Sequence, residues 1–290
     1  MIIVIAGPTG SGKTRLSLFL ANKLNGEIIN ADSTQVYKDL NIATNKVKDT
    51  KGIDHHLFDI VDITKDYSVF DYQKEAREKI DEVLKKGKTP ILVGGTGLYL
   101  KAALYDYEFS PKANNKYEGY SNDELYQKLL EVDPDTNIHL NNRVRVISAL
   151  NYYEANGEPY SLKEKNDNLI YDTLFIGLTA DRDILYYKIN KRVDEMMEEG
   201  LLEEARDLYD SNIRTKAVMT PIGYKELFLY FDGDKDINSC IELIKQRSRN
   251  YAKRQYTWFK NQMDLKWFRA DFENFEKTEN EVLDYIKKLL

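Results

Sequence analysis

The sequence has few of the residues that build disulfides and most protein metal sites. Its 290 residues include one cysteine, Cys240, and three histidines, at positions 55, 56 and 139. A single cysteine cannot form an internal disulfide, and a zinc site of Cys and His ligands needs more of them than the chain provides. We therefore expect oxygen atoms to hold any metal ion that the protein binds.

Long apolar runs and an excess of positive charge are also missing. No apolar run approaches the roughly 18 residues of a membrane-spanning helix, and an apolar segment follows Met1 at once, so we expect no signal peptide. We take the protein to be cytoplasmic and monomeric, with no membrane partner. The net charge is −6, from 42 Lys and Arg against 48 Asp and Glu, and this total alone argues against nucleic-acid binding.

The chain does contain a complete phosphate-binding loop, GPTGSGKT, between the apolar segment 2–6 and an amphipathic segment. In such a loop the glycines let backbone N–H groups surround a phosphate chain, the lysine supplies a positive charge, and the Thr hydroxyl binds Mg²⁺. We therefore predict that a di- or triphosphate binds the loop residues Gly7, Pro8, Thr9, Gly10, Ser11, Gly12, Lys13 and Thr14.

Strand and helix patterns alternate after this loop. Helical spacing over 13–24 and 70–86 separates short apolar segments at 27–31 and 90–94, and a further strand is expected at 173–178. This order predicts an α/β fold with a P-loop NTPase-like core, a parallel sheet flanked by helices. Between 106 and 172 the sequence is rich in Tyr and Asn and lacks a buried strand, so we expect a mainly helical insertion that divides the core into 1–105 and 173–290.

Two polar segments follow the predicted strands. Asp32 comes directly after the strand at 27–31, and Thr96 lies in a second glycine-rich turn, GGTG, after the strand at 90–94. In open α/β sheets such strand ends gather around the phosphate loop, which makes both residues site candidates. The alternative for each is a turn or helix-cap residue.

Positive charge is concentrated in one segment, 245–260, which reads KQRSRNYAKRQYTWFK and contains no acidic residue. Cations interleaved with aromatic rings suit a phosphate backbone and unstacked bases. The alternative is an ordinary solvated helix face over core aromatics.

In their order along the chain, the motifs GPTGSGKT, ADSTQVY, HHLFDIVD, GGTGLY, RVDEMMEEG, IGYKEL and AKRQYTWF resemble the bacterial tRNA dimethylallyltransferases. The resemblance covers essentially the whole chain. It implies a P-loop core, a helical insertion, dimethylallyl diphosphate as donor, Mg²⁺ and tRNA. It also implies attack by the N6 amine of the adenine 3′ of the anticodon.

The resemblance assigns three catalytic roles. Asp32 matches the base that accepts the N6 proton, Thr96 a residue near the target adenine, and Arg182 an arginine that contacts the pyrophosphate. For Arg182 the alternative is a surface ion pair with one of its acidic neighbours, Asp181 and Asp183.

The resemblance also implies tRNA contacts, because the target base has to leave its stack to reach the reactive carbon. Lys253 and Arg254 would meet phosphates, whereas Gln255 and Trp258 would read or stack on bases; Trp258 fits the core equally well as an alternative. Two departures in the insertion weaken its expected grip on phosphate: Ser148 replaces an arginine, and Lys116 is only a stand-in for another. The full set that matches tRNA-contacting segments is Asp32, Ser33, Thr34, Gln35, Thr96, Lys116, Val144, Arg145, Ser148, Gly223, Tyr224, Lys225, Lys253, Arg254, Gln255 and Trp258.

Two rival classes share part of this pattern. A P-loop kinase or NTPase would use the same loop to bind ATP and phosphorylate a small hydroxyl compound. A nucleotide-gated RNA-binding module would explain the basic segment but leaves Asp32 and the second glycine turn without a task.

Overall fold

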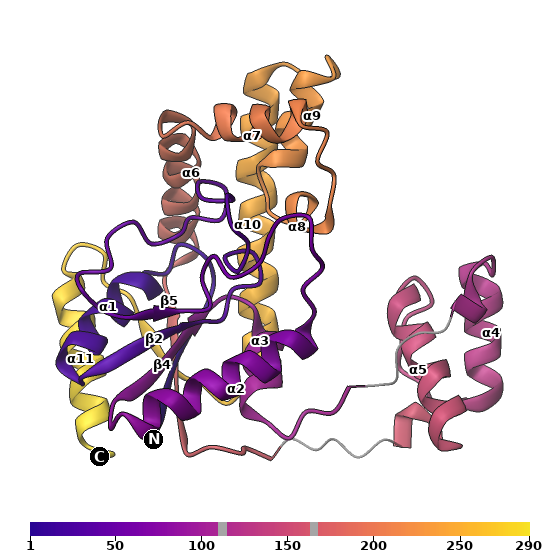
Figure 1. The fold of residues 1–290 in the computed structure, drawn as a ribbon, viewed down its shortest axis with the longest axis horizontal. Coiled ribbons are helices and arrows are strands. Elements are labelled where there is room, and N and C mark those ends of the chain that lie inside the picture. The colour runs from indigo at the N-terminus through magenta and orange to yellow at the C-terminus, as the bar shows by residue number, and fades with distance from the viewer. Residues whose placement is uncertain (110–114, 163–167) are drawn as a thin grey trace. The chain divides into compact units, whose positions relative to one another are not determined.

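The computed structural model describes residues 1–109, 115–162 and 168–290, which form two compact units (Figure 1). The first consists of Met1–Leu104 and Leu169–Leu290, and the second of Tyr105–Asn168. The insertion ends four residues earlier than the sequence pattern suggests, because the segment before the returning strand pairs with the first unit. Ile170 N donates to Leu104 O at 3.0 Å, and Ile2 N donates to Asp172 O at 2.8 Å.

The first unit is built on a six-stranded sheet in the order β3-β2-β4-β1-β5-β6. Every pair of neighbouring strands is parallel, which confirms the predicted α/β class. The strands are β1 (Ile2–Ala6), β2 (Gly26–Asn30), β3 (His55–His56), β4 (Thr89–Gly94), β5 (Thr173–Thr179) and β6 (Lys266–Arg269).

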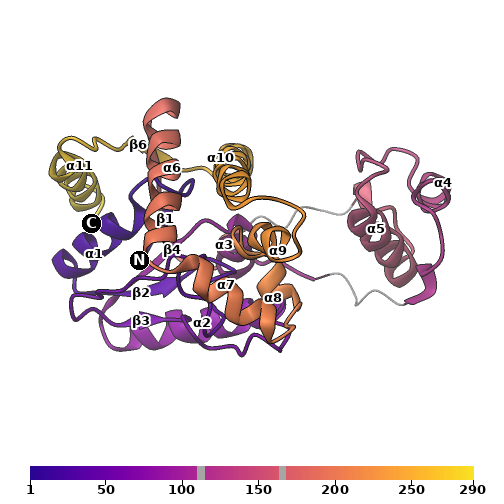
Figure 2. The ribbon, with the colours of Figure 1, turned by 90° about the horizontal axis from the view of Figure 1, so that it is seen from above.

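Helices cover both faces of this sheet and extend beyond it (Figures 1 and 2). They are α1 (Lys13–Lys23), α2 (Val69–Lys85), α3 (Gly97–Leu104), α6 (Arg182–Glu198), α7 (Leu201–Asp210), α8 (Lys216–Met219), α9 (Tyr224–Phe231), α10 (Ile237–Gln262) and α11 (Phe275–Lys287). Local sequence fixes several of their ends. Ser68 begins α2 with a reciprocal cap, in which its Oγ accepts from Asp71 N at 3.2 Å and Asp71 Oδ2 accepts from Ser68 N at 2.9 Å. In the part of the chain that the structure describes, no helix is long and apolar enough to cross a membrane.

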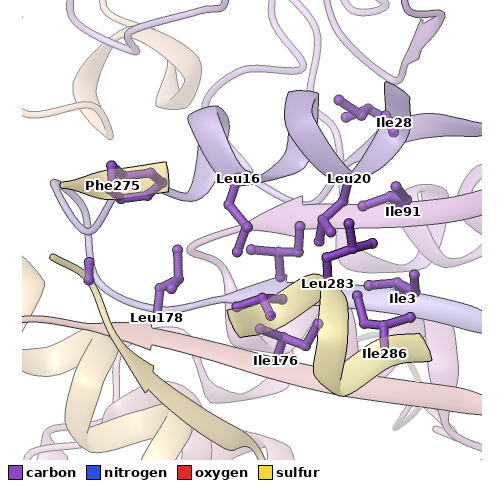
Figure 3. Packing of buried hydrophobic residues seen from close by; sticks show 14 residues of the cluster. Ile3, Leu16, Leu20, Ile28, Ile91, Ile176, Leu178, Phe275, Leu283 and Ile286 are labelled. Atoms are coloured by element: carbon purple, nitrogen blue, oxygen red, sulfur yellow. The ribbon is translucent and has the colours of Figure 1, made fainter. Parts of the chain in front are cut away.

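The main core lies between the sheet and the pair α1 and α11. Leu16 and Leu20 of α1 meet Leu283 and Ile286 of α11 over sheet residues such as Ile3 (Figure 3). All five residues of β1 are buried, as expected for a central strand of a parallel sheet covered on both faces. This packing holds the loop after β1 on a rigid base.

The second unit has its own small helical core. Its helices are α4 (Asn122–Val132) and α5 (Arg143–Asn156), with short 3₁₀ turns at Asn115–Tyr117 and Tyr160–Leu162. Leu125 and Leu129 of α4 pack against Val146, Ala149 and Leu150 of α5. Within the described part of this unit no strand occurs.

Candidate active site

Three loops meet at the carboxyl ends of neighbouring parallel strands. The phosphate loop follows β1, the segment Asp32–Thr34 follows β2, and the second glycine turn follows β4; in the sheet the order is β2-β4-β1. Two glycines allow the close approach. A Cβ on Gly7 would lie 2.3 Å from Leu178 O, and one on Gly94 would lie 2.0 Å from Ala31 O. The site therefore requires glycine, which has no Cβ atom, at these two strand ends.

Two half-buried cations lie at the phosphate loop. Lys13 Nζ donates to Pro8 O at 2.8 Å, and Arg192, from α6, donates through Nη1 to Thr9 Oγ1 at 2.9 Å. Burial lowers the pKa of Lys13 to about 8 and that of Arg192 to about 10. The charge of Asp32 partly offsets both pKa shifts, so it lies close to both cations.

Two polar atoms at this place have no partner. Arg192 Nε and Ser11 Oγ are buried, and among the described residues neither makes a hydrogen bond. An unpaired buried donor beside a second desolvated cation is costly unless a ligand pairs with it. With two positive charges and one carboxylate, the arrangement suits an anion with several acceptor oxygens, as the loop motif predicts.

Asp32 is held by a local turn and still has one oxygen free. Oδ1 accepts from Thr34 N at 3.0 Å and from Thr34 Oγ1 at 2.8 Å, while Asp32 N donates to Asn30 Oδ1 at 2.8 Å. Among the described residues no hydrogen bond reaches Oδ2. Oδ1 of Asp32 therefore has the turn role of the alternative, whereas Oδ2 remains available to accept a proton.

Thr96 joins the second glycine turn to the segment after β2. Its Oγ1 accepts from Ser33 N at 3.0 Å and lies 3.3 Å from Ser33 Oγ. The helix-cap alternative applies only to its backbone, since Thr96 O accepts the amides of Tyr99 and Leu100 at the start of α3. The side chain instead fixes the segment that carries Asp32.

The pyrophosphate contact of Arg182 stays a prediction. Its side chain is exposed at the first turn of α6 and lies over the Tyr186 ring, 5.1 Å from the centroid. Of its two acidic neighbours, Asp181 pairs with Arg269. Arg192 lies ten residues further along the helix, about 15 Å along the axis, and makes a hydrogen bond to the loop itself.

Sequence reasoning missed Arg192, although a signal was present. The buried face of α6 consists of Leu185, Ile189, Val193 and Met196, and Arg192 adjoins that face in the motif RVDEMMEEG. A cation on the apolar side of an amphipathic helix calls for a charged partner or ligand.

Gln255 and Trp258 both make contacts inside the first unit. Gln255 is 5% exposed and uses its amide internally, accepting from Thr9 N at 2.8 Å and donating to Gly95 O at 3.0 Å. Trp258 is half-buried against α3, where a Cβ on Gly97 would lie 2.0 Å from its ring. Gln255 therefore joins the two glycine loops through its amide, and Trp258 packs on α3; their contacts with bases stay predictions.

The basic segment of α10 is less free than its sequence suggests. Lys245 Nζ lies 2.8 Å from Asp194 Oδ1, Arg247 pairs with the fully buried Glu226, and Arg249 donates to Asn190 at 2.6 Å. The segment has no acid of its own, but α6 and α9 supply partners for three of its cations. Lys253 and Arg254 remain exposed, as does Lys260.

The remaining predicted tRNA contacts fall into three groups. Gly223 and Tyr224 are buried, with the Tyr224 hydroxyl donating to Glu204 at 2.7 Å, and their contact with tRNA stays a prediction. Lys225 and Gln35 are half-buried, and Gln35 Nε2 donates to Thr44 O at 2.8 Å.

The third group lies in the second unit. Val144 is 75% exposed and Arg145 is exposed beside it on α5, while Ser148 Oγ donates to Val144 O at 2.8 Å. Lys116 is exposed and paired with Glu154. These side chains stand at the surface of their unit, in keeping with a contact role that stays a prediction.

The residues present fit a magnesium ion that arrives with its phosphate ligand. Within the described ranges no group of three or more His, Cys, Asp or Glu residues could hold a metal. Mg²⁺ commonly takes only one or two protein oxygens, with phosphate oxygens and waters completing its shell. The Thr14 hydroxyl at the end of the loop is such an oxygen.

Comparison with known proteins agrees with this geometry. The IPP transferase family model matches residues 35–262. The tRNA dimethylallyltransferase of Anoxybacillus flavithermus is 47% identical over 298 residues, covering 99% of this chain and 96% of that protein. That of Bacillus subtilis is 46% identical over 282 residues, covering 92% and 90%.

Solved structures give the same result. A tRNA delta(2)-isopentenylpyrophosphate transferase from Staphylococcus epidermidis matches with a TM-score of 0.76 and 38% identity, covering 100% of this chain and 99% of that chain. A eukaryotic dimethylallyltransferase described as acting on tRNA matches with a TM-score of 0.86 and 33% identity, covering 99% and 79%. The fold and the site are those of a P-loop-type group transferase, and the chain belongs to the IPP transferase family.

Proposed function

We propose that this protein transfers a dimethylallyl group from dimethylallyl diphosphate to N6 of the adenine 3′ of the anticodon in a subset of tRNAs, releasing diphosphate. The observation that carries the proposal is the pair of half-buried cations, Lys13 and Arg192, beside the free oxygen of Asp32. Membership of the IPP transferase family supports the diphosphate of a prenyl donor as the anion that binds here.

The donor half of the reaction follows from the two cations. As the allylic C–O bond breaks, its electron pair passes to the diphosphate, and positive charge spreads over the allylic carbons. Lys13, Arg192 and the loop amides would stabilise the growing negative charge on the leaving group. Mg²⁺ bound by Thr14 and the phosphates would supply further neutralisation.

The acceptor half follows from Asp32. The N6 lone pair forms the new C–N bond, and the N6 proton passes to Asp32 Oδ2, so the product amine is neutral. The adenine has to leave its stack in the anticodon loop to reach this carboxylate. Thr96 and Ser33 hold the Asp32 segment in place through their side-chain contacts.

A transfer assay tests the proposal. The protein is incubated with Mg²⁺ and either carbon-labelled dimethylallyl diphosphate or γ-labelled ATP, with and without total tRNA. We expect label to enter tRNA only from the prenyl donor. Phosphorylation of a small hydroxyl compound from ATP would support the rival kinase, and tRNA binding without any transfer would support an RNA-binding module.

We also propose that the enzyme works as a cytoplasmic monomer. Light scattering during size-exclusion chromatography, with and without tRNA, tests the oligomeric state. A dimer in both conditions would contradict it.

A further inference from the structure

One face of α10 lies against both glycine loops. Gln255 bridges them through its hydrogen bonds with Thr9 N and Gly95 O. Tyr251 lies four residues earlier on the helix, so the two side chains share a face. Tyr251 has no role in the reaction as described above.

The Tyr251 hydroxyl lies within this site. It interacts with the side chains of Thr96 and Gln255, and the charge of Asp32 acts on it. The side chain is half-buried, and the Arg254 guanidinium lies 5.6 Å from its ring centroid. Burial first, and then Asp32, hold the pKa of Tyr251 well above its ordinary value, so the phenol keeps its proton and can donate it to a hydrogen bond.

The free oxygen of Asp32 lies on the same side. A Cβ on Gly95 would be 3.8 Å from Asp32 Oδ2 and 2.1 Å from Gln255 Nε2. Asp32 Oδ2, a hydrogen-bond acceptor, thus lies near the Gln255 amide, the group with which the Tyr251 hydroxyl interacts.

The acceptor Asp32 and the donor Tyr251 match one edge of adenine. The N6 amino group donates, and a ring nitrogen beside it accepts; guanine carries the acceptor O6 in place of the amino group. Building on the proposed function, we infer that Tyr251 donates a hydrogen bond to a ring nitrogen adjacent to N6 while Asp32 accepts from N6. Tyr251 is then a specificity-determining residue that aligns the adenine for attack.

A substrate-analogue cycle tests the inference. Anticodon stem-loop RNAs carry adenosine, 1-deazaadenosine or 7-deazaadenosine at the acceptor position, and kcat/KM is measured for the wild type and Tyr251→Phe. We expect one deaza analogue to lower kcat/KM of the wild type about 10-fold, the scale of one hydrogen bond in a buried site. Tyr251→Phe should lose about as much with adenosine and lose nothing further with that analogue.

The variant Tyr256→Phe is the matched control. Tyr256 lies on the same helix but is exposed, with its ring 5.2 Å from that of Trp267, and its variant should keep wild-type values with all three RNAs. The dissociation constant for pyrophosphate should be unchanged in both variants, because both keep the loop cations Lys13 and Arg192.

Three results would overturn the inference. The first is no loss by the wild type with either analogue; the second is wild-type activity of Tyr251→Phe with adenosine. The third is a loss of kcat/KM for Tyr251→Phe with the analogue that equals the product of the two separate losses. If the wild type transferred to none of the RNAs, the proposed function itself would fail, so the two failures are distinguishable.

Discussion

At the scale of residues, burial of Lys13 makes anion binding depend on pH. The protonated ammonium attracts the diphosphate, and its pKa in the free protein is about 8. Binding raises that pKa, so the complex takes up a proton, and affinity falls as pH rises through about 8. Calorimetric titration with pyrophosphate should show the dissociation constant rising up to about tenfold per pH unit above that value.

The variant Lys13→Arg separates this effect from the titration of pyrophosphate itself. A guanidinium stays charged at much higher pH, so the variant should lose the part of the pH dependence that comes from Lys13. Identical pH profiles for the two proteins would show that Lys13 does not titrate against the anion.

The two arginines of α6 make a matched pair of variants. Arg192→Ala removes a half-buried cation at the phosphate loop and should lower kcat/KM for the donor about 10- to 100-fold, the range of a charge-assisted hydrogen bond. Arg182→Ala removes an exposed cation and should stay within about twofold, as surface changes usually do. Steady-state kinetics with varied donor measures both, and the reverse ranking would show that Arg182 is the main arginine contact of the pyrophosphate.

Asp32→Asn tests the base. The amide keeps the shape but cannot take the N6 proton, so turnover should fall by about 10²- to 10⁴-fold while tRNA affinity changes only a few fold. Single-turnover transfer and filter binding give the two quantities. Turnover near the wild-type rate would remove Asp32 from this role.

The sequence predicted some of these site residues and missed one. Lys13 and Asp32 lie in short motifs whose geometry is local, so their neighbours follow from the strand ends they occupy. Arg192 reaches the loop only because α6 packs across it, with Leu185 and Ile189 touching the space above Gly10. The apolar face of α6 signals that Arg192 needs a partner, but no local pattern shows which loop the helix packs across.

At the scale of elements, α10 divides its cations between packing and surface. Lys245 and Arg249 face partners on α6, whereas Lys253 and Arg254 are exposed. The sequence predicted the helix-rich segment of about 237–263 well, because its periodicity is local. It did not reveal which charges are paired, because the partners lie on distant parts of the chain.

This division gives a prediction for tRNA binding. Changing Lys253 and Arg254 together to Gln should flatten the plot of log affinity against log salt by about 1.4 to 1.8, the equivalent of two phosphate contacts. The matched double variant Lys245→Gln/Arg249→Gln should leave the slope unchanged and lower thermal stability instead. Equal slopes for both double variants would mean that tRNA docks elsewhere.

At the scale of the whole molecule, the two units have separate cores. Leu129 is fully buried in the second unit and Leu20 in the first. Leu129→Ala should destabilise the second unit by about 2–5 kcal/mol and weaken tRNA binding, with pyrophosphate affinity unchanged. Hydrogen exchange should rise in α4 and α5 only, whereas Leu20→Ala should raise it in the sheet; exchange rising throughout for both would show one cooperative unit.

The alternation of strands and helices predicted the overall architecture but not how the sheet ends. Strand β6 has four residues, none of them fully buried. It lacks the apolar run that marks the other long strands in the sequence. Its place beside β5, and the packing of α11 over α1, arise from long-range burial. Local periodicity in the sequence does not reveal such long-range contacts.

The central claim is that the phosphate loop holds the diphosphate of the prenyl donor. Inhibition by inorganic pyrophosphate tests it most directly, with initial rates of transfer to tRNA measured over a range of dimethylallyl diphosphate concentrations. We expect competitive inhibition, in which saturating donor restores the full rate, and weaker inhibition in Lys13→Ala and Arg192→Ala. Inhibition that saturating donor does not relieve, or none at all, would place the donor elsewhere and contradict its binding at this loop.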